Sequence, residues 1–168
     1  MTVGILVQRF GAYIRDSYGS YELDAEVQAQ ADKAAEAFPA GLRDIRESIA
    51  HHLIPLVLLA RCDNDYDHRE RDVIVEHCVV VARQKGVELT DAHKAVFADY
   101  VSAFRPGLIQ LDPALDRLAR APQQEIAGLL RAAHNVVLAD GATRPEELRF
   151  FADLNRELEA ALAPPRSI

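Results

Sequence analysis

The stretch Ile49–Asp63, which reads IAHHLIPLVLLARCD, has a counterpart 77 positions later in Ile126–Asp140, which reads IAGLLRAAHNVVLAD. Apolar residues recur at helical spacing in both, and each ends in an aspartate that a glutamate, Glu70 or Glu147, follows. Both units therefore consist of an apolar helix, an acidic turn and a second helix with glutamate in its first turn. We expect the two helix-loop-helix units to pack by their apolar faces, with both acidic loops at one end.

The rest of the chain also has apolar residues three and four positions apart, and no long stretch alternates as a strand does. This predicts an all-α fold, a compact bundle of about seven to eight helices with two pseudo-twofold-related repeats. Pro55 is expected to kink the helix that contains it. The predicted helices are Thr2–Ser17, Asp24–Phe38, Leu42–Arg61, Arg69–Gln84, one capped by Thr90, a short one starting at Asp112-Pro113, Gln123–Ala139 and Glu146–Leu162.

Length and composition favour one domain. A chain of 168 residues with 49% hydrophobic residues is long enough to bury a single core. We expect a helical domain over 40–162, an N-terminal helical extension over 1–39 that packs on it, and a flexible tail over 163–168. The longest apolar run, Leu53–Ala60, is too short to span a bilayer, and the first residues lack the basic region of a signal peptide. A cytoplasmic location without direct membrane insertion is therefore expected.

Charge and motif content narrow the classes of function. The net charge of −7 argues against nucleic-acid binding and fits cations or basic partners better. Cys62 and Cys78 lack CxxC spacing and are expected to be buried thiols in a reducing compartment. No nucleophile elbow, phosphate-binding loop or dinucleotide fingerprint occurs, and no glutamate stands three residues before a histidine as in di-iron bundles. Enzymatic activity is therefore not expected.

The second acidic loop resembles a known family. Leu138-Ala139-Asp140-Gly141, followed by Pro145-Glu146-Glu147 and an apolar helix, is similar to the ADG…PEE loop of TerB-like domains and to the N-terminal domain of membrane-anchored DnaJ-like co-chaperones. The first loop is similar too, with Asn64 where glycine is usual, so that the resemblance covers 42–162. It implies a non-enzymatic binding or adaptor module of tellurite-resistance type. Such a module binds divalent metal through loop acids and works with other proteins of a stress-response system.

The repeat and the resemblance together indicate one metal site shared by Asp63, Glu70, Asp140 and Glu147. Four carboxylates suit calcium or magnesium, and zinc less well. An EF-hand is excluded, because glycine and glutamate are missing from the required positions of the first loop. In the second loop, Arg144 introduces the opposite charge, which weakens the expected binding. The sequence indicates no particular oligomeric state.

Two other interpretations of the acids stay open. Asp67 and Glu70 have the spacing of a capping box, so helix capping explains some acids without an ion. Internal arginine pairs or simple solvation explain others, because arginines flank both loops: Arg61, Arg69, Arg71, Arg144 and Arg149. An alternative function also stays open. Because Glu47 lies four residues before His51, a helical enzyme or ligand-binding protein could use Glu47, His51 and His52 in a pocket between the two hairpins.

Overall fold

The computed structural model describes residues 29, 32–33, 36, 38–62, 67–106, 110–139, 141 and 144–162. Within these ranges all regular structure is helical, which confirms the predicted all-α class. The predicted helix Thr2–Ser17, most of the predicted helix Asp24–Phe38 and the tail 163–168 lie outside the described residues. The helices are α3 (Ala40–Ser48), α4 (Ala50–Arg61), α5 (His68–Gln84), α6 (Asp91–Ala103), α7 (Leu111–Ala119), α8 (Gln123–Leu138) and α9 (Pro145–Leu162).

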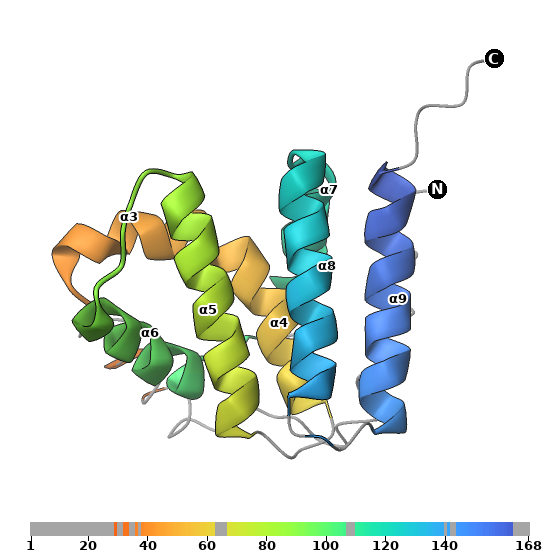
Figure 1. Cartoon of the computed structure of the whole chain (residues 1–168), viewed down its shortest axis with the longest axis horizontal. Coiled ribbons are helices and arrows are strands. Elements are labelled where there is room, and N and C mark those ends of the chain that lie inside the picture. The colour runs from red at the N-terminus through yellow and green to blue at the C-terminus, as the bar shows by residue number, and fades with distance from the viewer. Residues whose placement is uncertain are drawn as a thin grey trace.

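Helix α4 is the central element of the bundle. It contacts α3, α5, α7, α8 and α9, and all of its residues except Ala50 and Ile54 are buried. A helix that is apolar on every side is stable only when other helices enclose it. In Figure 1, α5, α8 and α9 stand side by side, and α4 lies behind α5 and α8. Helices α3 and α6 lie on the left of the view and run crosswise to α5. The core therefore forms around α4.

The predicted helix Leu42–Arg61 is divided into α3 and α4 at Ile49. The Ile49 backbone has φ −110° and ψ 4°, and its N–H is shared between two carbonyls of the preceding turn at 3.1 and 3.3 Å. The Ser48 hydroxyl donates to the Ile45 carbonyl at 2.8 Å, a local hydrogen bond of the kind that bends helices. Pro55, where we expected the kink, lies inside α4. The break therefore falls at Ile49, one turn before His52.

Other helix ends follow their local capping signals. Thr90 caps α6 as predicted, because its hydroxyl accepts the His93 N–H at 3.2 Å. Helix α5 ends before Gly86, whose φ of 84° is the left-handed conformation that glycine adopts without strain. Helix α7 begins at Leu111, so that Asp112 lies in its first turn instead of capping it. Caps thus fix these ends to within a residue or two of the prediction.

Burial agrees with the 77-residue register at some core positions and differs at others. Leu53 and Ile74 are buried whereas their counterparts Leu130 and Phe151 are only partly buried. Val73 is partly buried whereas its counterpart Phe150 is buried. Because the two burial patterns match only in part, the repeat stays a prediction. Fully buried residues coincide at Ile49 and Ile126, Leu56 and Ala133, Leu59 and Val136, and Val81 and Leu158.

The end of the N-terminal extension packs against α6. Phe38 is buried, with its ring centroid 5.0 Å from that of Phe97 and 5.4 Å from that of Tyr100. Cys62 and Cys78 are both buried, as expected, and burial raises the pKa of the Cys78 thiol to about 12. None of the helices in the described ranges has the length and apolar character that crossing a bilayer requires.

Candidate functional site

Two of the four predicted loop ligands are described, and both are buried. Glu70 lies in the first turn of α5 and Glu147 in the first turn of α9, each with 0% of its surface exposed. Asp63 and Asp140 lie outside the described residues. The ends of α4 and α8 and the starts of α5 and α9 share one end of the bundle (Figure 1). The four-carboxylate site stays a prediction. Glu70 and Glu147 lie at the same end of the bundle, as such a site requires.

The capping box predicted for Asp67 and Glu70 is present in the structure. Asp67 accepts the Arg69 N–H at 2.7 Å, and Glu70 accepts the Asp67 N–H at 3.5 Å, which completes a capping box. The Arg69 guanidinium also donates to Asp67 at 3.2 Å, and this hydrogen bond lowers the pKa of the Asp67 carboxyl. The buried Arg61 donates to the Ser102 carbonyl at 2.8 Å. Caps and arginine contacts therefore account for part of the first loop without an ion.

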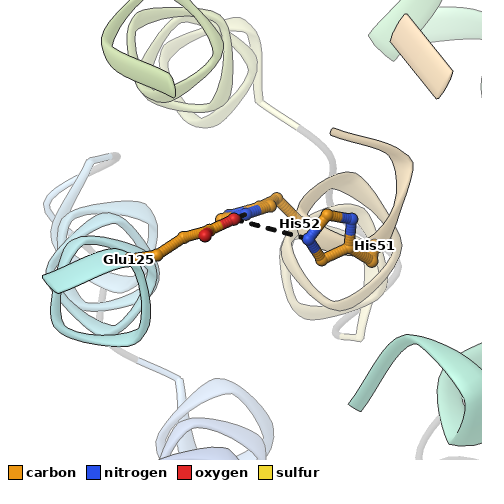
Figure 2. A group of neighbouring side chains, drawn as sticks. All are labelled: His51, His52 and Glu125. Atoms are coloured by element: carbon orange, nitrogen blue, oxygen red, sulfur yellow. Dashed lines mark hydrogen bonds and ion pairs between the residues drawn. The ribbon is translucent and has the colours of Figure 1, made fainter. Parts of the chain in front are cut away.

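A second group of potential metal ligands lies at the opposite end of α4. His51 and His52 belong to the first turn of α4, and Glu125 belongs to the first turn of α8. The distance from His52 Nε2 to Glu125 Oε1 is 2.6 Å, and His51 Nε2 lies 3.5 Å from the same oxygen. Figure 2 shows the carboxylate reaching from α8 toward the two imidazole rings of α4. From α5, His77 Nε2 lies 3.0 Å from His52 Nδ1.

Glu47, the acid that the sequence associates with His51, does not join this cluster. Its side chain is 71% exposed and lies 4.0 Å from the Arg46 guanidinium. The helix break at Ile49 separates Glu47 from His51, so their four-residue spacing no longer places them on one helix face. The carboxylate beside His51 and His52 is therefore that of Glu125 and not that of Glu47.

The repeat contains a signal that could have found Glu125. Glu125 directly precedes Ile126, the counterpart of Ile49, so the register places it within one turn of the positions equivalent to His51 and His52. Two such helices that lead into loops at one end also begin together at the other end. His77 carries no such signal, because its counterpart in the register is Leu154.

Burial keeps the three histidines neutral. It lowers the pKa of His51 to about 4 and that of His77 to about 3, with the charge of His52 as the next cause in both. Burial also lowers the pKa of His52. Burial alone would raise the pKa of Glu125, but the hydrogen bond from His52 and nearby positive charges outweigh it and leave this pKa lowered. Neutral imidazoles beside an ionised carboxylate are the protonation states that metal ligation requires.

The ionised Glu125 carboxylate determines which ring nitrogens of His52 and His77 carry hydrogen. An ionised carboxylate only accepts, so His52 donates from Nε2 to Glu125 Oε1. The neutral His52 ring then accepts at Nδ1, and His77 must donate from Nε2. His51 Nδ1 is buried without a hydrogen-bond partner, which costs about 1–3 kcal/mol. The cluster is therefore a hydrogen-bonded chain from His77 to Glu125 with one unsatisfied nitrogen beside it.

The donor atoms are close enough to hold an ion. A ring nitrogen from each of His51 and His52 and an oxygen of Glu125 all lie within 4.8 Å of one another. Tetrahedral zinc with ligands at about 2.0–2.2 Å needs them about 3.3–3.6 Å apart. The His51–Glu125 distance of 3.5 Å already fits, whereas the His52–Glu125 distance of 2.6 Å must widen as an ion replaces the hydrogen. Three protein ligands leave one position open for water or another ligand.

A groove between α5 and α8 reaches this cluster at one residue. Its volume is about 360 Å³, and His77, 8% exposed, is the cluster residue that lines it. The other lining residues are Asp72, Val73, Glu76 and Val80 of α5 and Gly128, Arg131, Ala132 and Asn135 of α8. The groove is therefore lined by His77 and not by His51, His52 or Glu125.

Comparisons of this chain with family models, with curated proteins and with solved structures give no match. The resemblance to TerB-like domains stays a prediction, so the chemistry of the site is argued from its geometry and electrostatics.

Proposed function

We propose that this chain is a non-enzymatic binding module of the stress-response type implied by the TerB-like resemblance, and that it binds a divalent metal ion between α4 and α8. The observation that carries the proposal is the convergence of donor atoms within 4.8 Å from two buried histidines, His51 and His52, and the partly buried Glu125. Buried, neutral histidines that share one carboxylate are typical of a metal-ligand set, whereas ordinary core positions hold apolar side chains. Other proteins of a stress-response system are the proposed partners.

The ligand set favours a transition metal over calcium or magnesium. Imidazole nitrogens suit zinc, copper, nickel and cobalt, whereas calcium and magnesium take oxygen ligands. The first choice is zinc, because two histidines and one glutamate with an open position are a known zinc ligand set. Calcium or magnesium remains the expectation for the loop acids Asp63, Glu70, Asp140 and Glu147. The two sites therefore differ in the ion that they select.

An ion at this position would hold the two hairpins together. His51 and His52 belong to the first hairpin and Glu125 to the second, and α4 contacts α8 directly. Because the ligands come together only in the folded chain, binding stabilises the fold by mass action. The groove between α5 and α8 reaches His77 and not the donor atoms, which supports a binding role over the alternative of an enzyme acting through Glu47, His51 and His52.

Calorimetry and thermal melts with zinc, nickel and cobalt test the proposal. We expect one ion per chain at the His cluster and a melting temperature that rises with the logarithm of the free zinc concentration above Kd. Glu125→Gln keeps the shape of the side chain but removes its charge, and it should abolish the zinc response. Glu47→Gln, which changes an exposed acid in the same way, is the matched control and should bind as the wild type does.

Cobalt substitution adds a direct view of the ligands. A tetrahedral site with nitrogen ligands gives cobalt an intense visible absorption, whereas an octahedral all-oxygen site leaves it pale. A wild type that responds to none of the three metals, or a Glu125→Gln variant that binds zinc unchanged, would overturn the proposal. Calcium binding that survives Glu125→Gln would instead locate an ion at the acidic loops.

A further inference from the structure

His77 touches the proposed ligand set without belonging to it. It lies in the middle of α5, is 8% exposed, and its Nε2 is 3.0 Å from His52 Nδ1. We infer that His77 is a positioning residue of the metal site: once a metal ion is bound, it accepts a hydrogen bond from His52 Nδ1 and so holds His52 in the tautomer whose Nε2 binds the ion. This inference rests on the proposed function, since it concerns how that site is prepared for metal.

The argument begins with the two nitrogens of His52. Without metal, Nε2 carries the hydrogen and donates it to Glu125 at 2.6 Å. A metal ion takes the lone pair of Nε2, so the hydrogen of a neutral ring must then be on Nδ1. A buried Nδ1–H needs an acceptor, and His77 Nε2 stands at hydrogen-bond distance from it. Metal-ligating histidines regularly donate their second ring N–H to such a partner, which fixes ring and tautomer.

His77 suits this role because a histidine can either donate or accept at Nε2. In the metal-free chain it donates from Nε2 to His52 Nδ1, and in the metal-bound chain it must accept there. The proton on His77 Nε2 therefore moves to His52 Nδ1, the proton displaced from His52 Nε2 leaves to solvent, and His77 Nδ1 takes one up. Both rings are neutral with one hydrogen each before and after, so the proton exchange leaves their charge unchanged.

The position of His77 beside the groove makes this exchange feasible. His52 is enclosed at 1% exposure, whereas His77 lines the groove between α5 and α8. Protons can pass between the groove and the His77 ring, and across the 3.0 Å hydrogen bond to His52. Helix α5 thus supplies the hydrogen-bond partner of His52, whereas the proposed metal ligands themselves all come from α4 and α8.

Replacing His77 by glutamine and by leucine tests the inference. Glutamine places an amide where the imidazole Nε2 stood and can donate or accept, so His77→Gln should keep zinc affinity within a few-fold of the wild type. His77→Leu fills the space but offers no acceptor, and it should weaken zinc binding by about 10–100-fold. Glu125→Gln, measured in parallel, should abolish binding and confirm that the zinc is at the proposed site.

Nitrogen-15 NMR of the imidazole rings gives a readout that packing alone would not change. In the wild type, zinc should move the His52 hydrogen from Nε2 to Nδ1 and turn His77 Nε2 from donor to acceptor. Equal zinc affinity in the leucine and glutamine variants, or a His52 hydrogen that stays on Nε2 with zinc bound, would overturn the role of His77 and leave the metal site standing. Absence of zinc binding in the wild type would overturn both. If the leucine variant does not fold, the wild-type spectra still decide the question.

Discussion

Glu125 is the residue on which the interior polar cluster depends. It is the one acid in the metal-ligand group, and two histidines lie within 3.5 Å of one of its oxygens. Removing a charged partner from a buried pair leaves the remaining groups desolvated without compensation. His52 is satisfied as a neutral ring, because its Nε2 donates to Glu125 and its Nδ1 accepts from His77.

The metal-free protein should lose stability as the pH falls. The pKa values of His51 and His77 are lowered from 6.5 to about 4 and about 3, so below pH 6.5 the unfolded chain binds protons at these positions that the folded chain does not. Stability is therefore complete above pH 6.5 and declines as the pH falls toward these folded pKa values. Each histidine contributes a slope of up to about 1.4 kcal/mol per pH unit.

Urea unfolding with a chelator, followed across this pH range, measures the slope. His77→Gln should make it shallower, because one of the groups that gains a proton on unfolding is gone. His134→Gln removes a histidine from the exposed surface of α8 and serves as the control. A free energy of unfolding that stays constant from pH 6.5 to about 4 would contradict the burial argument.

At the scale of the elements, α8 contains a glycine that packing does not require. A Cβ added at Gly128 would meet no atom within 4 Å, whereas Gly86 has a φ of 84° at the end of α5. Gly128→Ala should therefore raise the free energy of unfolding by up to about 1 kcal/mol, because alanine favours the helix. Gly86→Ala should lower it by about 1–2 kcal/mol, because a side chain is strained in the left-handed region.

Urea titrations of the two variants separate these effects. Opposite signs are expected, with the groove volume beside Gly128 reduced by one methyl group. A destabilising Gly128→Ala would indicate that the groove must stay open at this point. A neutral Gly86→Ala would contradict the assignment of Gly86 as the residue that ends α5.

The elements also show where sequence reasoning succeeds. Both ends of α5 and the start of α6 agree with the prediction to within one residue, because Asp67, Glu70, Thr90 and Gly86 act on the backbone beside them. The break at Ile49 depends on how α3 packs across α4, which local pattern does not contain. Glu125 was missed for a related reason, since its contact with His52 joins residues 73 positions apart and depends on the rotation of two helices.

At the scale of the whole molecule, the two candidate ion sites lie at opposite ends of the same helices. His52 lies in the first turn of α4, which ends at Arg61, and Glu125 lies in the first turn of α8, which ends at Leu138. With a rise of about 1.5 Å per residue, the sites are about 14–20 Å apart. That separation exceeds the Debye length of about 8–10 Å and the range over which mutations usually couple. The two sites should therefore bind independently, although one fold assembles both.

Zinc and calcium melts on a set of four proteins test this independence. Glu125→Gln should abolish stabilisation by zinc and leave that by calcium, Asp140→Asn should do the reverse, and the double variant should respond to neither. Loss of the zinc response in Asp140→Asn alone would place the ion at the loops and refute independence. If the wild type responds to zinc but not to calcium, the loop acids are either paired with the Arg144 guanidinium or act only as caps and surface charge. Pairing with Arg144 predicts that Arg144→Ser creates a calcium response that Glu125→Gln does not remove, because that response arises at the far end of α8.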